Sequence, residues 1–373
     1  MKYNLSDICD YVRGKVDVAS LIYENYISTE NMISNKGGIT SASSLPSVAQ
    51  TQSFKVGDIL VSNIRPYFKK IWFAEFNGGC SNDVLVLRAK DGISKKFLYY
   101  VLTDDTFFNY SMLTSKGTKM PRGDKAAIMK YEVPGFTYKE QEKIAKILEA
   151  FDKKIQLNSN INDNLLEQAL TLYKKYFPYN VDDEFPNGWR IGTVGEIIEI
   201  HDSKRIPLSS AERMKMTRKI YPYYGAASLM DYVDDFIFNG KYLLLGEDGT
   251  VVDSSGYPIL QYVCGKFWVN NHTHILTGKL GFNVESLYML FKQTPVKSIV
   301  TGAVQPKISQ TNLRSIRVVI PPKKLLKDYN CLVDPLFSLF RLNKEENKSL
   351  ATLRDTLLPK LMSGEIDVSS VKI

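Results

Sequence analysis

Two histidines and two neighbouring carboxylates are the residues of this chain whose spacing could support metal or acid–base chemistry. His272 and His274 alternate along VNNHTHILT, so both side chains face one side of a strand and could bind a metal. No cysteine or carboxylate close by in the sequence completes a ligand set, which favours histidines that have hydrogen-bond partners within the fold or that face DNA. Glu247 and Asp248 follow an apolar strand in GEDGT; they could form a catalytic pair, and a polar loop is the simpler interpretation.

The short motifs of nucleotide-dependent enzymes are absent from the sequence. It contains neither G-x-G-x-x-G nor G-x-x-x-x-G-K-[ST], which disfavours dinucleotide and P-loop binding. It also lacks the Asn-Pro-Pro or Asp-Pro-Pro motif of amino-methyltransferases and the Pro-Asp dipeptide of the common nuclease motif. A stand-alone enzyme, such as a metal-dependent nuclease that uses Glu247 and Asp248, is therefore the weaker hypothesis.

Basic side chains gather in loops that also carry aromatic residues, amides or turns. One basic loop is usually a solvated surface, but cations bind phosphates, and Arg, Lys, Asn and Gln side chains read base edges. The candidate nucleic-acid contacts are Arg65, Lys69 and Lys70 in NIRPYFKK, Lys116, Lys119 and Arg122 in SKGTKMPRGDK, Tyr223 and Tyr224 in YPYYG, Asn271 and His272 in VNNHT, and Gln305 and Lys307 in VQPKIS. For the two tyrosines, packing in the core is an equally good interpretation.

The chain repeats itself when Gly117 is aligned with Gly302, an alignment called the repeat alignment below. SKGTKMPRGDK and VTGAVQPKISQ each hold a G-x-x-x-P segment, and a short apolar strand, a proline and a long helix follow each of them. In this alignment Gln305 and Lys307 are expected where Lys119 and Arg122 lie in the first copy. The repeating unit is therefore a globular domain, a basic loop, a strand and a long helix.

Asparagine interrupts the apolar pattern of both long helices. Rows of residues spaced by seven, with a second row offset by four, predict a coiled-coil seam, although two unrelated amphipathic helices would also show such rows. The rows are Ile144, Phe151, Asn158, Leu165 and Leu172 with Leu148, Ile155, Asn162, Ala169 and Tyr176, and their copies are Tyr329, Leu336, Asn343, Leu350 and Leu357 with Val333, Phe340, Asn347, Arg354 and Leu361. The matching asparagines predict that the helices pair with each other, with the register set by Asn158, Asn162, Asn343 and Asn347.

The expected fold class is α+β, with two globular domains separated by two long antiparallel coiled-coil helices. We place the domains at residues 1–138 and 180–322, a central spacer helix at 139–179, and a C-terminal spacer helix with a tail at 323–373. Antiparallel packing of the helices would give an elongated molecule with a pseudo-two-fold axis and a domain at each end. Pro335 lies inside the second helical pattern and could kink that helix or shift its start.

The composition favours a cytoplasmic protein that binds an anionic partner. The formal net charge is +8, which suits nucleic acid or an anionic surface. The four cysteines are scattered, as expected in a reducing compartment. The N-terminus does not read as a signal peptide, and no apolar run is long enough for a bilayer, so we expect no membrane partner.

Together these features resemble the specificity (S) subunit of type I restriction–modification systems over essentially the whole chain. VPGFTYKEQEKIAKILEAFDKKIQLNSNINDNLLEQ is similar to the central spacer helix of that family, and TLLPKLMSGEIDV is similar to its C-terminal ending. YPYYGAAS and GAVQPKIS resemble landmarks of its target-recognition domains. Two departures are a second helix that begins PPKKLLKDYNCLVDPLF, without the glutamine-glutamate start, and a first domain without a counterpart of YPYYG.

The resemblance implies a non-catalytic subunit that binds double-stranded DNA. Each target-recognition domain would read one half of a split site, and the helices would set the gap and dock two modification (methyltransferase) subunits. No cofactor or metal is expected in this chain: S-adenosylmethionine belongs to the modification subunits, which methylate adenine at N6, and ATP and magnesium belong to a restriction subunit where one is present. The alternative from a different class is a coiled-coil scaffold that binds only protein.

Overall fold

The computed structural model describes residues 2–302, 304–369 and 371 of the chain, which divides into two compact units. Unit 1 comprises residues 1–156 and 347–373, and unit 2 comprises residues 157–346. Each unit holds one globular domain, called domain 1 and domain 2 below. Each also holds part of both long helices, α5 (Tyr138–Tyr176) and α10 (Lys323–Ser363).

The two long helices begin at positions that the repeat alignment makes equivalent, and they contain 39 and 41 residues. A capping box starts α5: Thr137 and Glu140 each accept a hydrogen bond from the backbone N–H of the other. The helix ends just before the Pro-containing segment FPYNVDDEFPNGW, residues 177–189, which contains neither helix nor strand. No helix in the described part of the chain is long and apolar enough to cross a membrane.

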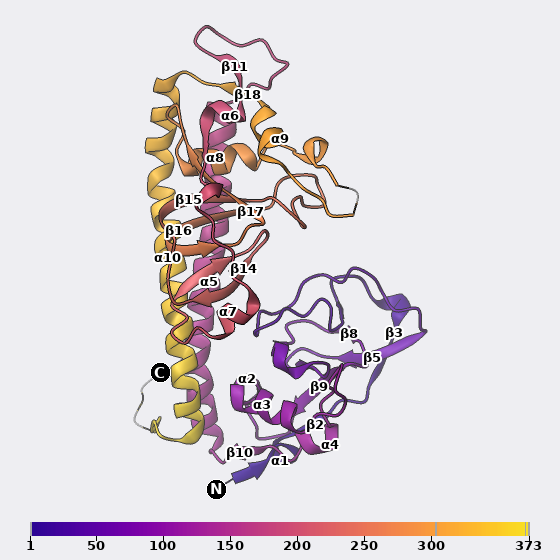
Figure 1. Cartoon of the computed structure of the whole chain (residues 1–373). Coiled ribbons are helices and arrows are strands. Elements are labelled where there is room, and N and C mark those ends of the chain that lie inside the picture. The colour runs from indigo at the N-terminus through magenta and orange to yellow at the C-terminus, as the bar shows by residue number, and fades with distance from the viewer. Residues whose placement is uncertain (1, 303, 370, 372–373) are drawn as a thin grey trace. The chain divides into compact units, whose positions relative to one another are not determined.

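The asparagines lie in the seam between α5 and α10. Every residue of the four predicted heptad rows is buried or half-buried. In unit 2, the side-chain amide of Asn343 donates to the side-chain oxygen of Asn162 at 2.9 Å, and Asn158 donates to the carboxylate of Glu346 at 2.7 Å. In unit 1, Asn347 donates to a backbone carbonyl of α5 at 3.2 Å. Partner numbers fall along α10 as they rise along α5, so in each unit the helices pair antiparallel, side by side in Figure 1.

Pro335 lies within α10 and does not shift the start of that helix, which is Lys323. The ring is exposed, the backbone has no N–H to give to the carbonyl of Cys331, and helices disfavour an interior proline by about 3 kcal/mol relative to alanine. We therefore expect Pro335→Ala to raise the free energy of unfolding of unit 2 by about 1–3 kcal/mol, measured by chemical denaturation. Lys327→Ala, an exposed position of the same helix, is the control with a change within about 0.5 kcal/mol. Equal stability of the two variants would contradict the expectation.

Domain 1 is built on two small sheets whose β-branched and aromatic strands were recognisable in the sequence. The first has the order β2-β9-β6-β7, with neighbours antiparallel, and the second has the order β3-β5-β8-β4, with β4 parallel to β8. The strands are β2 (Cys9–Tyr11), β3 (Lys15–Asp17), β4 (Tyr26–Ile27), β5 (Gln50–Phe54), β6 (Ile59–Ser62), β7 (Ile71–Phe73), β8 (Gly78–Cys80) and β9 (Val84–Ala89).

The stretch KKFLYYVLTDDTFFNYSM, residues 95–112, has the apolar pattern of one helix but folds as two, α2 (Lys95–Thr103) and α3 (Asp105–Leu113). Asp104 interrupts it with non-helical backbone, and its carboxylate accepts a 2.7 Å hydrogen bond from the N–H of Thr106. Asp104 therefore caps the start of a second helix, and this break cannot be predicted from the apolar periodicity.

Domain 2 contains one six-stranded sheet in the order β12-β17-β15-β16-β13-β14, in which only β13 and β16 pair in parallel. The strands are β12 (Ile198–Ile200), β13 (Tyr221–Tyr224), β14 (Leu229–Val233), β15 (Phe238–Gly246), β16 (Leu260–Val269) and β17 (Thr273–Gly278). The apolar stretches KYLLLG, PILQYVCG and HTHILT supply much of β15, β16 and β17, and ESLYMLFKQ supplies most of helix α8 (Val284–Phe291).

Small elements repeat in both domains. Two-stranded sheets pair β1 (Lys2–Asn4) with β10 (Glu132–Pro134) and β11 (Arg190–Thr193) with β18 (Arg317–Ile320). The short helices are α1 (Leu5–Ile8), α4 (Lys125–Ile128), α6 (Val194–Ile197), α7 (Ser210–Met214) and α9 (Gln310–Ser315). The pair α4 and β10 recurs as α9 and β18 in the repeat alignment, immediately before each long helix.

Each domain packs onto its own parts of α5 and α10. In unit 1, the domain core includes Ile144 and Leu148 of α5 and Leu361 of α10. In unit 2, the core includes Ala169 of α5 and Tyr329 of α10, which donates its hydroxyl to the Ala169 carbonyl at 3.2 Å. The long helices are therefore structural parts of the domains, since their apolar faces complete both cores.

Candidate nucleic-acid interface

A short turn of equal length occurs at the same place in both domains. In domain 1, Lys116 and Arg122 exchange two backbone hydrogen bonds of 2.9 Å. In domain 2, Thr301 and Lys307 exchange the equivalent bonds of 2.9 and 2.8 Å. The second residue of each turn is a glycine, with φ of +92° and +85°, a conformation that other residues adopt only with strain. Both ends of the second turn match their counterparts in the repeat alignment, so the predicted repeat is confirmed in three dimensions.

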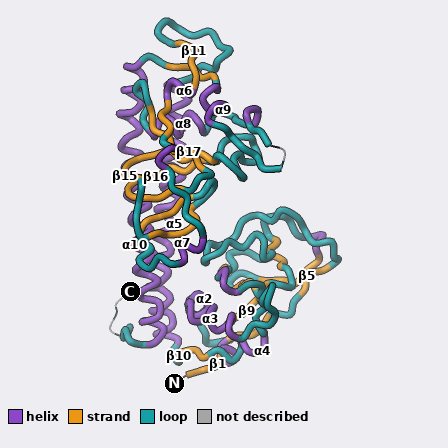
Figure 2. The backbone as a smooth tube through the Cα atoms, in the orientation of Figure 1, coloured by secondary structure: helices purple, strands orange, loops and turns teal. Residues whose placement is uncertain are grey.

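The turns correct one predicted equivalence. Lys307 does occupy the place of Arg122, as predicted. Gln305 corresponds to Met120 and not to Lys119, because the two turns have equal length and leave no room for a one-residue slip. Most predicted contacts, those of the two turns included, lie in loops and turns, which are teal in Figure 2.

Backbone hydrogen bonding joins two of the predicted basic loops of domain 1. The N–H of Arg65 donates to the carbonyl of Pro121 at 2.8 Å. The guanidinium of Arg122 lies 3.2 Å from the carboxylate of Asp83, which is the last residue before β9. NIRPYFKK and SKGTKMPRGDK therefore form one continuous surface, called the domain 1 basic surface below.

Lys116 and Lys119 are exposed residues of this surface. The ammonium of Lys116 lies 2.6 Å from the carboxylate of Asp124, and hydrogen bonding and charge from that carboxylate raise the pKa of Lys116. Lys119 lies at the tip of the turn. Both side chains carry a positive charge at neutral pH and can contact phosphates.

Lys69 and Lys70 are half-buried at the other end of the NIRPYFKK loop. Lys69 pairs with the carboxylate of Asp105 at 2.8 Å. Lys70 donates to the backbone carbonyl of Thr29 at 2.6 Å, and burial lowers its pKa. These two lysines therefore hold the loop against its neighbours as well as adding positive charge.

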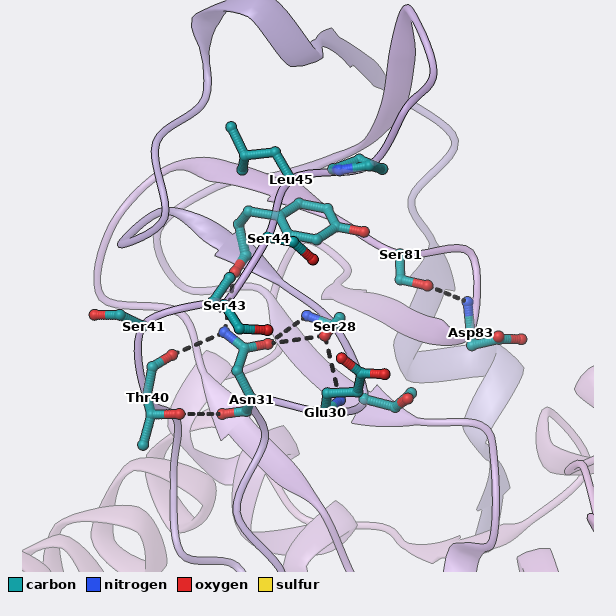
Figure 3. Close-up of a pocket in the computed structure, with 14 residues that line it drawn as sticks. Ser28, Glu30, Asn31, Thr40, Ser41, Ser43, Ser44, Leu45, Ser81 and Asp83 are labelled. Carbon is teal, nitrogen blue, oxygen red and sulfur yellow. Dashed lines mark hydrogen bonds between the residues drawn. The ribbon is translucent and has the colours of Figure 1, made fainter. Parts of the chain in front are cut away.

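A polar pocket of about 410 Å³ borders the domain 1 basic surface and shares Asp83 with it (Figure 3). Asn31 forms its floor: the side-chain amide donates to the carbonyls of Tyr26 and Thr40 at 3.0 and 2.8 Å, and its oxygen accepts from the N–H of Ser28 at 2.6 Å. The other lining residues include serines from the ITSASS segment and Glu30. Hydroxyls and carboxylates accept hydrogen bonds, so this pocket suits the exocyclic amino groups of bases.

In domain 2, Lys307 is held between two carboxylates. Its ammonium lies 3.4 Å from Glu247 and 3.5 Å from Asp248. Burial lowers the pKa of Lys307, but the charges of the two carboxylates raise it by more. Glu247 also accepts from Arg205 at 2.6 Å, and Asp248 lies 3.5 Å from the half-buried ring of His272. GEDGT is therefore a polar loop that anchors cations, and its carboxylates are paired.

His274 tests the metal hypothesis. Asp202, Glu247 and His274 bring ligand-type atoms within 4.8 Å of one another, so the structure supplies the carboxylates that were not apparent in the sequence. The two ring nitrogens of His274, however, lie 2.6 Å from the Asp202 carboxylate and 2.7 Å from the carbonyl of Ile308. Both ring nitrogens are thus engaged by polar groups within the fold, which favours a structural role for the ring over metal binding. The cluster is a buried ion-pair network that positions the loop before α9.

Asn271 and Gln305 are exposed residues near this network. Asn271 lies in the turn before β17, and its backbone carbonyl accepts from Arg205 at 3.2 Å. Since Arg205 also binds Glu247, one guanidinium links the turn at residue 271 to the GEDGT loop. Asn271, His272, Gln305 and Lys307 therefore belong to one group of loops on domain 2.

The structure corrects the prediction for Tyr223 and weakens it for Tyr224. Tyr223 is 1% exposed, its hydroxyl accepts from the N–H of Leu208 at 3.2 Å, and the guanidinium of Arg213 lies 4.9 Å from its ring centre. Tyr224 is half-buried, with its ring 5.9 Å from that of Phe267, and burial raises its pKa to about 12. YPYYG is strand β13 of the central sheet, so Tyr223 packs in the core and does not face a ligand.

Comparison with known proteins identifies a group of similar chains. The family model described as "Type I restriction modification DNA specificity domain" matches residues 1–167 and 186–352. The chain is 25% identical to the type I restriction enzyme MjaIX specificity subunit of Methanocaldococcus jannaschii, over 76% of this chain and 71% of the relative. It is 21% identical to the type I restriction enzyme HindI specificity subunit of Haemophilus influenzae, over 98% of this chain and 99% of the relative.

A solved structure shares the fold of the chain. It is the crystal structure of the S subunit of a type I restriction–modification system from M. genitalium, with 21% sequence identity and a TM-score of 0.56. The alignment covers 97% of this chain and 96% of that chain. The likeness therefore extends through both domains and both long helices.

Proposed function

The chain belongs to the family of type I restriction–modification DNA specificity proteins, and from this premise we propose that its two domains each read one half of a bipartite double-stranded DNA site. The observation that carries the proposal is the recurrent turn. A cation ends the turn in both domains: Arg122, which pairs with the carboxylate of Asp83, and Lys307, which pairs with those of Glu247 and Asp248. A DNA site with two unlike halves requires similar contacts from two domains whose surrounding residues differ, and the repeated turn meets this requirement.

The long helices would set the gap between the half-sites. At about 1.5 Å per residue, the 39 residues of α5 extend about 58 Å, which is the length of about 17 base pairs. The buried asparagine contacts fix one register, because any slip would leave amide groups buried without partners. We expect a discrete gap length as a result.

The modification subunits would dock on the solvent faces of α5 and α10. Large apolar side chains there are 44–66% exposed, which leaves apolar area for a protein partner; they are Leu157, Leu332, Leu339, Leu342 and Leu353. S-adenosylmethionine would be bound by those partners, which would methylate adenine at N6. ATP and magnesium would belong to a restriction subunit in systems that have one. This chain would contribute sequence recognition and no catalytic group.

Adenine-methylation mapping tests the proposal. Cells that make this chain with its cognate modification subunits are expected to carry N6-methyladenine in both halves of one split motif, as read by single-molecule sequencing. Cells with the modification subunits alone are the control. If a purified complex of all subunits forms and binds DNA without sequence preference, the proposal is wrong and a protein scaffold is the better account.

Arg122→Ala and Lys307→Ala are expected to act on different half-sites. Each removes one side chain that reaches DNA from its own domain, with an expected loss of about 1–3 kcal/mol in binding free energy at the corresponding half. Binding to duplexes with one scrambled half-site would measure this: each variant should lose preference for one half and keep it for the other. A uniform loss across both halves from either variant would assign that side chain to phosphate contact alone.

A further inference from the structure

Two exposed aromatic rings stand on the domain 1 basic surface. Tyr67 and Phe68 form part of the single turn η2 (Pro66–Phe68), are 48% and 37% exposed, and touch each other with ring centres 4.6 Å apart. The ammonium of Lys70 lies 5.7 Å from the Phe68 ring. Large adjacent aromatics normally bury their area, so their exposure here calls for a ligand.

The backbone that presents these rings is strained. Among the described residues, six non-glycine residues have positive φ, and four of them surround this turn: Asn35 (+56°), Lys36 (+61°), Arg65 (+48°) and Lys69 (+50°). Such conformations persist only where neighbouring structure holds them, and they concentrate at functional sites. The strained backbone therefore indicates that the conformation of this segment serves a function.

The turn is also held rigidly. The N–H groups of Asn35 and Lys36 donate to the carbonyls of Phe68 and Lys69 at 2.8 and 2.9 Å, so the two strained turns lock each other. Lys36 and Lys69 share the carboxylate of Asp105, the first residue of α3, at 2.9 and 2.8 Å. The rings therefore sit on a preorganised support and not on a mobile loop tip.

Positive charge and an unsatisfied donor belong to residues that flank the turn η2. The buried Nε of Arg65 is, within the described part of the chain, a donor without an acceptor, which is unusual in a folded protein. The backbone of Arg65 is bonded to the turn that carries Lys119 and Arg122. Phosphate oxygens pair with cations such as Lys119 and Arg122, so the surroundings of the aromatic pair favour DNA over an apolar protein surface.

We propose that Tyr67 and Phe68 form an aromatic wedge that enters the base stack within the half-site read by domain 1; this inference rests on the proposed function. Apolar side chains inserted between base steps unstack them and bend the duplex, and a rigid support is what makes insertion effective. Pyrimidine–purine steps such as TA and CA unstack most easily, so the wedge selects such a step without hydrogen bonds to its bases.

Domain 2 provides an internal comparison. In domain 1, NIRPYFKK forms a backbone β-bridge with Arg122. In domain 2, GEDGT forms the corresponding β-bridge with Lys307, and GEDGT carries no aromatic residue. The wedge is therefore a property of one half-site only. The half-site of domain 2 is read without it.

The test uses the assembled complex of this chain with its modification subunits and duplexes that carry the mapped site. 2-Aminopurine replaces one base at a time through both half-sites, in the absence of S-adenosylmethionine and with a catalytically inactive modification subunit as well as the active one. Fluorescence is expected to rise several-fold at one step of the domain 1 half-site with both forms of the complex, because unstacking relieves quenching. The target adenine positions are excluded from the comparison.

Variants separate the wedge from ordinary binding. Tyr67→Ala with Phe68→Ala is expected to abolish the fluorescence rise and to weaken binding to the specific site about ten- to hundred-fold, as the loss of stacking does elsewhere. Tyr67→Phe keeps the ring and should keep the signal. Tyr138→Ala removes an aromatic of similar exposure (55%) at the start of α5 and should behave as the unaltered chain.

The outcomes distinguish the two proposals. Specific binding with no fluorescence rise in the domain 1 half-site overturns the wedge and leaves the proposed function intact, as does a double alanine variant with unchanged signal and affinity. A requirement for Tyr67 and Phe68 in binding the modification subunits, measured without DNA, would reassign them to a protein contact and also overturn it. A complex without any sequence preference overturns the proposed function and the wedge together.

Discussion

Lengthening both long helices by one heptad, after Gln156 and after Glu346, is expected to widen the gap of the DNA site by about three base pairs and to leave both half-sites unchanged. Seven helical residues add about 10.5 Å, and a base pair occupies about 3.4 Å. Seven residues also return the apolar rows close to their original face, since the helix drifts only about 20° per heptad. The inserted residues should carry leucine at the two seam positions.

The contacts between α5 and α10 determine where the insertions belong. In unit 2, Asn158 contacts Glu346, and in unit 1, Asn347 contacts the carbonyl of Ile155. Insertions at the boundary between the units keep both of these contacts, because the two partners of each pair stay on the same side. An insertion after Asn162 would instead separate it from Asn343, with which it shares a hydrogen bond.

Methylation mapping of the lengthened chain is the measurement. The control is the same heptad inserted in α5 alone, which shifts the register of the seam and is expected to prevent assembly or abolish methylation. A lengthened chain that modifies the original site with its original gap would show that the helices do not act as a ruler. Altered half-sites with an unchanged gap would contradict the division of labour between domains and helices.

The second large effect is expected from His274→Leu. The substitution removes a fully buried ring that is hydrogen-bonded to Asp202 and to the carbonyl of Ile308, and it leaves the 6%-exposed Asp202 carboxylate with fewer partners. Breaking such a buried pair destabilises proteins by about 3–5 kcal/mol. Recognition of the domain 2 half-site should also be lost. The ring contacts the carbonyl of Ile308, which directly follows Lys307 at the end of the turn, so its removal should displace Lys307. Chemical denaturation and half-site binding measure the two effects.

The pH dependence of this effect follows from Asp202. Burial raises the pKa of this carboxyl, but hydrogen bonds and positive charge from His274, together with the N–H of Ile275 and the charge of Arg205, lower it by more. A lowered pKa in the folded state gives stability that is full above the unfolded pKa and is lost as the pH falls through the folded value. The difference between the unaltered chain and His274→Leu should thus be largest near neutral pH and shrink below about pH 4.

His272→Leu is the matched control for this prediction. Its side chain is 45% exposed, and its contact with Asp248 is 3.5 Å long, so its removal should change the free energy of unfolding by less than about 1 kcal/mol. Equal destabilisation by the two variants would mean that the Asp202 pair is not the source of the effect. A stable His274→Leu chain that still reads both half-sites would exclude a positioning role for the ring.

Periodicity predicted the long-range architecture well. The heptad rows with asparagine identified α5 and α10 and their pairing, because a seam is written along one continuous segment and repeats often enough to be recognised. The repeat alignment likewise identified the turns ending at Arg122 and Lys307, since glycine and proline recur there at fixed offsets. Heptad rows and glycine–proline turns can be predicted from sequence because the residues that determine them lie close together in the chain.

The surroundings of the site were not predictable in the same way. Asp83 pairs with Arg122, and Asp202 pairs with the ring of His274. The two residues of each pair are far apart in the sequence, and only folding brings them together. Asp105 is similar: one carboxylate serves Lys36 and Lys69, which come from two separate turns. Tyr223 was misassigned for the opposite reason, since a tyrosine beside glycine has the same local pattern whether its strand is central or at a surface.

The discontinuous make-up of unit 1 matters for how such a gene can diversify. Unit 2 is one uninterrupted stretch, residues 157–346, whereas unit 1 is assembled from the segments on either side. A double crossover at the codons for residues 157 and 346 would import a complete domain 2 together with its own part of the seam between α5 and α10. The contact of Asn162 with Asn343 would travel inside the cassette, and that of Asn347 with Ile155 would stay behind. A single recombination event would thereby produce a folded chain with one inherited and one foreign recognition half.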